Sequence, residues 1–170
     1  MKISAGVLLS CLFLLCACKD GGTNSSQQMR GFAIYKLADT TILASSVWNA
    51  SLDTLELCLT PFLTETDLQA YYWSTHLFVA NAKIDSEFSK MKYLLGKSGG
   101  LPFVVVVDQS RIYLGAFWWG YSSSIPQGSY IPIGAPSPFR INHDPLAAIP
   151  DRRSDSRIHE ALKAAMILQQ

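Results

Sequence analysis

The side chains that could act as nucleophile and base in this chain are three consecutive serines and a histidine beside an aspartate. Ser122, Ser123 and Ser124 stand together, and His143 is followed directly by Asp144. A serine that a histidine deprotonates attacks esters and amides, which is the chemistry of many hydrolases. The serines lack the GxSxG motif and the strand–turn–helix setting that expose such a nucleophile. We therefore interpret 122–124 as a polar loop and keep a Ser/His hydrolase as the alternative.

The sequence predicts no metal, nucleotide or other cofactor site. His76, His143 and His159 do not share the short spacing of zinc ligands, and neither HExxH nor CxxC occurs. The Gly-Lys-Ser at 96–98 lacks the upstream glycine of a phosphate-binding loop and follows a predicted helix, whereas such loops follow a strand. We expect each histidine to be structural or exposed, and the chain to work without a cofactor.

Three of the four cysteines lie close to the N-terminus. Cys11, Cys16 and Cys18 lie in or directly after a mostly apolar stretch at 3–15, which Lys2 precedes. The stretch is too short to cross a bilayer, since a spanning helix needs about 20 residues. A short positive start followed by roughly 7–15 apolar residues is typical of a secretory signal peptide.

The four residues that end this stretch, Leu15, Cys16, Ala17 and Cys18, resemble the lipobox of bacterial lipoprotein signals. The resemblance implies cleavage between Ala17 and Cys18, with a thioether-linked diacylglycerol and an N-acyl chain on Cys18. Two or more acyl chains anchor a protein stably in a lipid bilayer, whereas one binds only marginally. An ordinary signal peptide that contains a cysteine, or an uncleaved anchor, is the alternative.

The residues after Cys18 predict where the protein is sorted and how it is tethered. By the same resemblance, Lys19 in place of aspartate implies the outer membrane, and the single acid Asp20 leaves open whether the domain faces the periplasm or the cell surface. Residues 19–30 are rich in Gly, Ser, Asn and Gln, which predicts a flexible tether. A coil of that length spans about 20 Å, so the domain at 31–170 would stand just clear of the headgroups.

The charge of the chain argues against a nucleic-acid-binding protein, and its cysteine content argues against a disulfide-stabilised one. Removal of 1–17 takes away one of the 14 basic side chains and none of the 13 acidic ones, so the mature chain is formally neutral. A neutral chain without a basic run is not expected to bind nucleic acid. Cys58 is the one cysteine left free, so no intrachain disulfide is expected, and we interpret it as a small buried apolar residue.

Hydrophobic periodicity predicts the elements of one domain at 31–170. The apolar run at 102–108 and the returning run at 111–118 predict an antiparallel hairpin whose first strand is buried on both faces. Thr64 and Asp67 have the spacing of a capping box. Further strands are predicted at 31–37, 55–59, 74–80, 130–133 and 140–141, and helices at 44–48, 65–72, 84–96 (capped by Asp85 or Ser86) and 154–168.

Aromatic residues at the end of the hairpin are the predicted binding surface. Trp118, Trp119 and Tyr121 precede a segment to Pro138 that is rich in Pro, Gly and Ser. Neighbouring residues on a strand point to opposite faces, so at most one of the two tryptophans is fully in the core. Exposed Trp and Tyr are favoured anchors of interfaces. The alternative is that the segment to Pro138 folds back and buries both tryptophans.

Three segments resemble an uncharacterised group of small bacterial secreted or lipid-anchored proteins. These are Thr64–Asp67, Tyr72–His76 and Phe103–Trp118. The order of capped helix, strand, helix and hairpin is also similar to the periplasmic domain of the protein-export subunit SecD. The resemblance implies an α+β fold, with helices packed on one face of an antiparallel sheet, and no established activity.

The leading hypothesis is a lipid-anchored protein of the bacterial cell envelope that binds a partner without catalysis. The anchor at Cys18 and the aromatic segment at 117–121 support it. The expected partners are the lipid bilayer, through acylated Cys18, and an envelope protein or component of unknown identity. An envelope hydrolase with a Ser/His site, and a structural or immunity-type lipoprotein, are the two alternatives.

Overall fold

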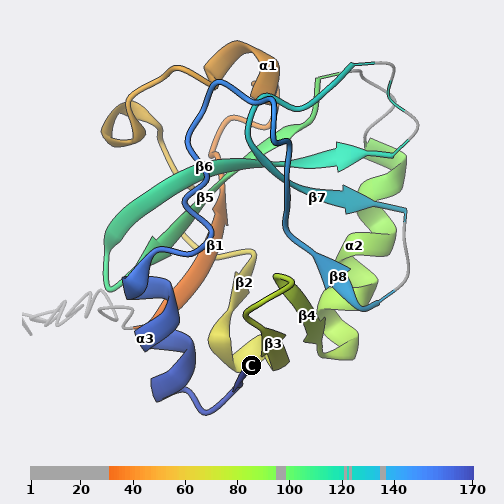
Figure 1. Cartoon of the computed structure of the whole chain (residues 1–170). Coiled ribbons are helices and arrows are strands. Elements are labelled where there is room, and N and C mark those ends of the chain that lie inside the picture. The colour runs from red at the N-terminus through yellow and green to blue at the C-terminus, as the bar shows by residue number, and fades with distance from the viewer. Residues whose placement is uncertain (1–30, 95–98, 121, 123, 135–136) are drawn as a thin grey trace, which may run out of the picture.

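A six-stranded sheet forms the centre of the fold in the computed structural model of the chain (Figure 1). The structure describes residues 31–94, 99–120, 122, 124–134 and 137–170. The predicted signal peptide at 1–17, the lipidated Cys18 with its tether at 18–30, and the predicted helix end at Gly96 lie outside the described residues. Those features stay predictions, and the fold is that of the part from Gly31 onward.

The strands of the central sheet follow one another in the order β2-β1-β5-β6-β7-β9. They are β1 (Phe32–Lys36), β2 (Leu63–Thr64), β5 (Leu101–Val107), β6 (Ser110–Trp119), β7 (Ser129–Ile133) and β9 (Asn142–His143). Every neighbouring pair is antiparallel except β6 and β7, which are parallel. The strands predicted at 31–37 and 130–133 are therefore confirmed as β1 and β7.

The predicted hairpin is confirmed as β5 and β6. The two strands are joined at Asp108 and Gln109, whose φ angles are 45° and 70°. Positive φ at both central residues defines the type I′ turn, whose twist matches that of the flanking strands. The turn therefore sets Val107 opposite Ser110, and the pairing extends to Leu101 opposite Phe117 with one shift of register between Val105 and Val106.

β5 is buried on both faces, as its unbroken apolar sequence predicts. Phe103, Val105 and Val107 belong to one hydrophobic core, and Val104 and Val106 belong to a second. Since successive side chains of a strand point to opposite faces, the sheet separates these two cores. A parallel or central strand covered on both sides has this kind of sequence.

A four-stranded sheet packs on the first core. Its order is β10-β3-β4-β8, and β10 runs parallel to β3 while the other pairs are antiparallel. The strands are β3 (Leu68–Tyr72), β4 (Leu77–Ala80), β8 (Phe139–Arg140) and β10 (Leu168–Gln169). Tyr71 and Phe78 carry the contact, since both are fully buried in the same core as Phe103.

Helices lie on both faces of the central sheet, which does not confirm the expectation that they share one face. Among the described residues the helices are α1 (Ala44–Val47), α2 (Ala82–Leu94) and α3 (Ser156–Ala164), with short 3-10 turns η1 (Leu52–Thr54) and η2 (Glu65–Asp67). α2 and α3 pack on the first core, whereas Ala44 of α1 packs in the second core with Trp48 (Figure 1). The mixed helix and strand content and the mostly antiparallel pairing are confirmed.

The predicted helix at 65–72 is wrong, although its capping box is present. The Thr64 backbone N–H donates to Asp67 Oδ2 at 3.0 Å, but the box closes only the single turn η2. The chain then forms β3, because Leu68 and Tyr71 enter the core as β3 pairs with β4 and β10. Tertiary pairing here overrides the local helical pattern.

Three other predicted elements are shortened. The strand predicted at 55–59 is reduced to a single bridge between Leu37 and Leu57, and Leu59 is fully exposed. The strand predicted from Ser74 begins only at Leu77, since His76 has a φ of 52° in a turn. The last helix ends at Ala164, because Met166 has a φ of 58° and β10 follows.

Two helix N-termini are capped by polar side chains. Asn81, not Asp85 or Ser86, caps α2, since its Oδ1 accepts from the Ile84 N–H at 3.1 Å. Of Ser154 and Asp155, the two caps that the sequence offers for this helix, Asp155 caps α3, and its carboxylate accepts from the Arg157 N–H at 3.0 Å. Each cap satisfies a backbone N–H that has no partner inside its helix.

A methyl group at Gly115 should destabilise the domain. Gly115 lies opposite Phe103, and a β-carbon there would be 2.4 Å from an atom of the Phe103 ring. Because the ring is buried and cannot move freely, Gly115→Ala should lower the free energy of unfolding by about 1–3 kcal/mol. Gly120→Ala is the matched control, since nothing lies within 4 Å of a β-carbon at that position. Urea unfolding measures both variants, and equal stabilities would contradict this packing.

Candidate functional site

The structure pairs His143 with a serine other than the three that the sequence singles out. His143 Nδ1 lies 3.1 Å from the Ser129 Oγ, where β9 pairs with β7. The Ser122 and Ser124 hydroxyls hydrogen bond to each other at 2.8 Å, and Ser123 lies outside the described residues. The loop predicted at 122–124 thus has its own polar contacts, apart from the histidine.

The pair of Ser129 and His143 is shielded from solvent on the serine side. Ser129 is 3% exposed. Asp144 accepts from the Leu146 N–H at 2.8 Å within a turn. A nucleophile must be reachable by its substrate and be aligned with a base. The geometry therefore favours a cross-strand hydrogen bond that joins β7 to β9 over a catalytic site.

His76 lies at the centre of a buried polar network. Its side chain is 7% exposed, with Nδ1 3.0 Å from the Tyr71 hydroxyl and Nε2 3.4 Å from the Ser154 hydroxyl. Burial, with the Arg153 charge adding to it, lowers the pKa of His76 to about 4. A buried imidazole with such a pKa is neutral at physiological pH. The Trp73 ring packs against both His76 and His159, with centroids 5.7 and 4.9 Å apart.

The described cysteine and the charged side chains show no metal-binding arrangement. Cys58 is half-buried, with its Sγ 3.3 Å from the Leu37 carbonyl oxygen. Across the part of the chain that the structure describes, no three His, Cys, Asp or Glu side chains gather as metal ligands would. In the same described ranges, no helix has the length and apolar character needed to span a membrane.

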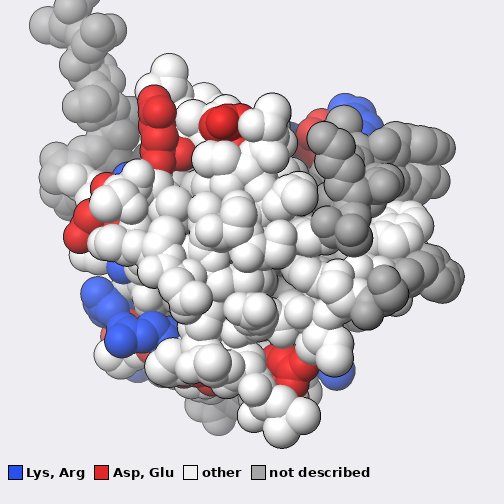
Figure 2. Space-filling model, turned by 90° about the horizontal axis from the view of Figure 1, so that it is seen from above, with Lys and Arg blue, Asp and Glu red and all other residues white. Residues whose placement is uncertain are grey.

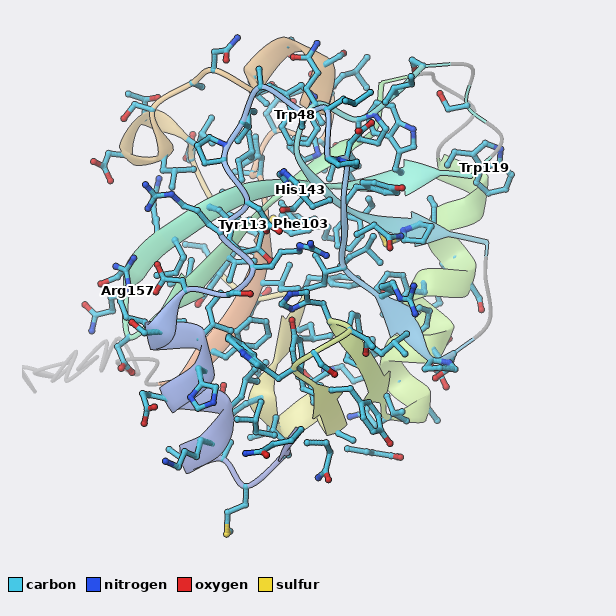
Figure 3. All side chains as sticks on the ribbon, in the orientation of Figure 1. Trp48, Phe103, Tyr113, Trp119, His143 and Arg157 are labelled. Atoms are coloured by element: carbon cyan, nitrogen blue, oxygen red, sulfur yellow. The ribbon has the colours of Figure 1, made fainter. Side chains whose placement is uncertain are left out.

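Of the predicted aromatic surface, Trp118 is a core residue. It is 5% exposed, and its indole N–H donates to the Ser124 carbonyl oxygen at 3.2 Å. Trp119 is half-buried and packs against the first core near the end of β6 (Figure 3). Tyr121 lies outside the described residues. Since Trp118 points inward, the part of this surface that the structure can place is the exposed part of Trp119.

The face of the domain that carries α1 has charged side chains mainly at its rim (Figure 2). Residues 112–139 contain no Lys, Arg, Asp or Glu. Among the described residues, the well-exposed large apolar side chains include Leu59, Ile125, Leu146 and Met166. Single exposed apolar side chains are common on soluble domains and do not define a site.

A pocket of about 570 Å³ lies between α3 and the turn of the β5–β6 hairpin. One side is formed by residues of three segments that are distant in sequence: Gly31, Glu65, Val107 and Asp108. The α3 side is formed by Ser156, Arg157, Glu160, Ala161, Ala164 and Ala165. Figure 3 shows Arg157 at the start of α3. No sequence pattern predicts this pocket, because its polar residues form no motif.

Two carboxyl groups converge on Gly31 at the edge of the pocket. The Gly31 N–H donates to Asp108 Oδ1 at 2.6 Å, and the Asp108 N–H donates back to the Gly31 carbonyl oxygen at 3.1 Å. Gly31 has a φ of 96°, and a β-carbon there would be 2.4 Å from Glu65 Oε1. A residue with a side chain is therefore strained here on two counts. The start of the domain is held firmly beside the pocket.

The polar wall of the pocket is mostly acidic. Burial raises the pKa of Glu65, and the charge of Asp108 adds to the effect. Within the described residues, Glu65 Oε2 is buried without a hydrogen-bond partner. The Arg157 guanidinium is held by Asp155, with Nε 2.9 Å and Nη2 2.8 Å from its two oxygens. The wall thus combines acids, one neutralised arginine and apolar alanines.

Comparison of the chain with protein-family models, with curated proteins and with solved structures finds no match. The resemblances drawn from the sequence therefore stay predictions. The functional argument rests on the chain's own residues.

Replacement of Trp118 should cost much of the stability of the domain. Trp118→Ala removes a large side chain from the second core and leaves a cavity beside Gly100, whose β-carbon position is 2.4 Å from the ring. The free energy of unfolding should fall by about 3–5 kcal/mol. Trp119→Ala is the comparison, and its smaller buried surface should give a smaller loss. Chemical denaturation of both variants checks this, and a near-neutral Trp118→Ala would mean that the indole is at the surface.

Proposed function

We propose that this chain is a lipid-anchored protein of the bacterial cell envelope whose domain binds a partner without catalysis. The lipobox at Leu15–Cys18 supports the anchor, and the neutral mature chain is consistent with a partner other than nucleic acid. The proposed binding place is the pocket between α3 and the hairpin turn. The observation that carries this assignment is the pocket itself, about 570 Å³ with both apolar and charged lining.

The pocket has the composition of a binding site. Ligand pockets of roughly 300–1,000 Å³ combine an apolar lining with a few polar groups that orient the ligand. Here Ala161, Ala164 and Ala165 supply apolar surface, and Glu65 and Asp108 supply oriented carboxyl groups. Asp108 is fixed by its two hydrogen bonds with Gly31, so its position is set before a partner arrives. Such preorganisation lowers the entropic cost of binding.

The place of the pocket suits an anchored protein. Gly31 lines the pocket and is the residue at which the predicted tether joins the domain. With a flexible tether of about 20 Å attached beside it, the pocket would stay close to the membrane surface. We therefore expect the partner to be held at the membrane surface, as an envelope protein or another envelope component.

The alternative of a Ser/His hydrolase is favoured by one observation, the contact of Ser129 with His143. Against it stands the burial of Ser129, which is 3% exposed. A binder does not depend on that hydroxyl, whereas a hydrolase that uses it does. A structural or immunity-type lipoprotein would share the anchor and could bind through another surface.

Loss of the thiol at residue 18 should abolish lipid attachment. Cells that express the chain are fed an alkyne-bearing fatty acid, and the label on the purified protein is measured. Cys18→Ser should carry none, because the thioether cannot form. Cys58→Ser is the matched control and should be labelled like wild type. Label that persists on Cys18→Ser would contradict the anchor.

A large side chain in the pocket should prevent partner binding. Ala164→Trp places an indole at the exposed α3 wall, whereas Ala148→Trp adds the same group at an exposed position outside the pocket. Partners that co-purify from the envelope are quantified by mass spectrometry. A partner enriched by wild type, Ala148→Trp and Ser129→Ala should be lost from Ala164→Trp.

Two outcomes of this experiment contradict the proposal. Equal enrichment by Ala164→Trp would place the binding surface elsewhere on the domain. Loss of biological function in Ser129→Ala, with the fold and partner capture intact, would favour the hydrolase.

A further inference from the structure

His76 joins the turn between β3 and β4 to the segment that leads into α3. Its Nε2 lies 3.4 Å from the hydroxyl of Ser154, which is 78 residues away in sequence. The neighbouring Arg153 donates to the Ile141 carbonyl oxygen at 2.7 Å, and the Ile141 N–H donates to the His76 carbonyl oxygen at 3.0 Å. The side chain and the backbone of His76 are therefore both connected to the segment at 151–154.

Several titratable and charged groups surround this imidazole. Tyr71 from β3 is its hydrogen-bond partner, and burial raises the pKa of both Tyr71 and the nearby Tyr113 of β6, so both stay neutral in acid. The segment before α3 contributes Arg153 and Asp151, whose oxygens accept from the guanidinium at 2.7 and 2.9 Å. The hydrogen bond from Arg153 lowers the pKa of Asp151 to about 2.

The α3 side adds a second histidine. His159 packs edge-on against Trp73 at a centroid distance of 4.9 Å, and its Nδ1 lies 3.0 Å from Glu160 Oε1. Trp73 thus contacts both imidazoles. Asp151, the acid whose charge acts on His76, forms an ion pair with Arg153.

Protonation of His76 is unfavourable in this closed arrangement. A neutral imidazole offers one donor and one acceptor, which suit the two hydroxyls of Tyr71 and Ser154. A protonated ring carries a charge into a site that is 7% exposed and lies near the Arg153 guanidinium. Burial without a free counter-ion makes that charge costly. Opening of the segment at 151–156 would return the ring to water.

We propose that His76 is an acid-sensitive latch that holds the segment at 151–156, and with it the α3 wall of the pocket, closed while it is neutral. α3 and its C-cap Ala165 supply six of the residues that line the pocket. Opening of the latch would therefore change the pocket and release a bound partner in acid. The effect on a partner rests on the proposed function, whereas the latch itself does not.

The direction of the pH dependence follows from linkage. The closed domain holds the pKa of His76 at about 4, below the ordinary value of 6.5, so the open form binds the proton more tightly. The closed form is fully favoured above pH 6.5, and this preference is lost as the pH falls toward 4. The opening equilibrium should rise on the order of 10–100-fold between pH 7 and pH 4.5.

Hydrogen exchange on the isolated full-length protein tests the latch. Amide exchange, corrected for the intrinsic effect of pH, is followed by mass spectrometry from pH 7 to pH 4.5. Peptides that cover Asp151–Ala164 should open on the order of 10–100-fold more in acid, while peptides of β5 and β6 should not change. A flat response in Asp151–Ala164, or an equal rise in β5 and β6, would overturn the proposal.

Two variants assign the response to one group. His76→Gln keeps a polar amide but cannot titrate, so its exchange should not depend on pH. Glu65→Gln removes a second titratable group, which lies beside α3 and whose pKa burial raises, and this variant should keep the acid response. An acid response that persists in His76→Gln, or disappears in Glu65→Gln, would refute the latch.

Direct titration of the imidazole keeps the proposal testable if His76→Gln does not fold. The His76 imidazole resonances of wild type are followed by NMR. His76 should show no titration between pH 7.5 and 5.5, and a midpoint near its ordinary value in the closed domain would contradict the latch. Since no partner is present, a failure of partner capture at pH 7 would affect the proposed function alone.

Discussion

Burial of β5 on both faces is the constraint on which the rest of the structure depends. Phe103, Val105 and Val107 must be covered by elements packed on one face of the sheet, and Val104 and Val106 by elements packed on the other. Each such side chain contributes roughly 1.5–3 kcal/mol when it is fully buried. The four-stranded sheet, α2 and α3 provide the first cover, and α1 with Trp48 and Trp118 provides the second. The hairpin turn at the end of β5 then places Asp108 beside α3, which creates the pocket.

The sequence predicts those features that depend on neighbouring residues. The hairpin at 102–118 can be predicted because two apolar runs flank a polar turn, and the sequence narrows the cap of α3 to Ser154 or Asp155. The capping box of Thr64 and Asp67 can also be predicted, but the length of the helix that follows it cannot. Whether the chain continues as a helix after Asp67 is decided by the pairing of β3 with β4 and β10. The pairing of β3 with β10 joins residues almost 100 positions apart, which no local pattern encodes.

The candidate site is invisible to sequence patterns for the same reason. Gly31, Glu65, Asp108 and Arg157 come from four separate segments and have no fixed spacing that chemistry requires. The sequence predicts His76 within a strand, and its contact with Ser154 arises only in the folded domain. Conversely, residues that stand out in the sequence can have a structural role. Trp118 is buried, and its indole N–H donates to the Ser124 carbonyl oxygen. Residue types indicate possible chemistry, whereas access and geometry decide it.

The central claim is that the domain is held to a membrane by lipid on Cys18, because the proposed place of the partner depends on that anchor. Intact-mass spectrometry of the protein purified from its own envelope tests this most directly. The account predicts a chain that begins at Cys18 and carries the added mass of a diacylglycerol and a third acyl chain. A chain that retains residues 1–17, or that has a free thiol at Cys18, would contradict it.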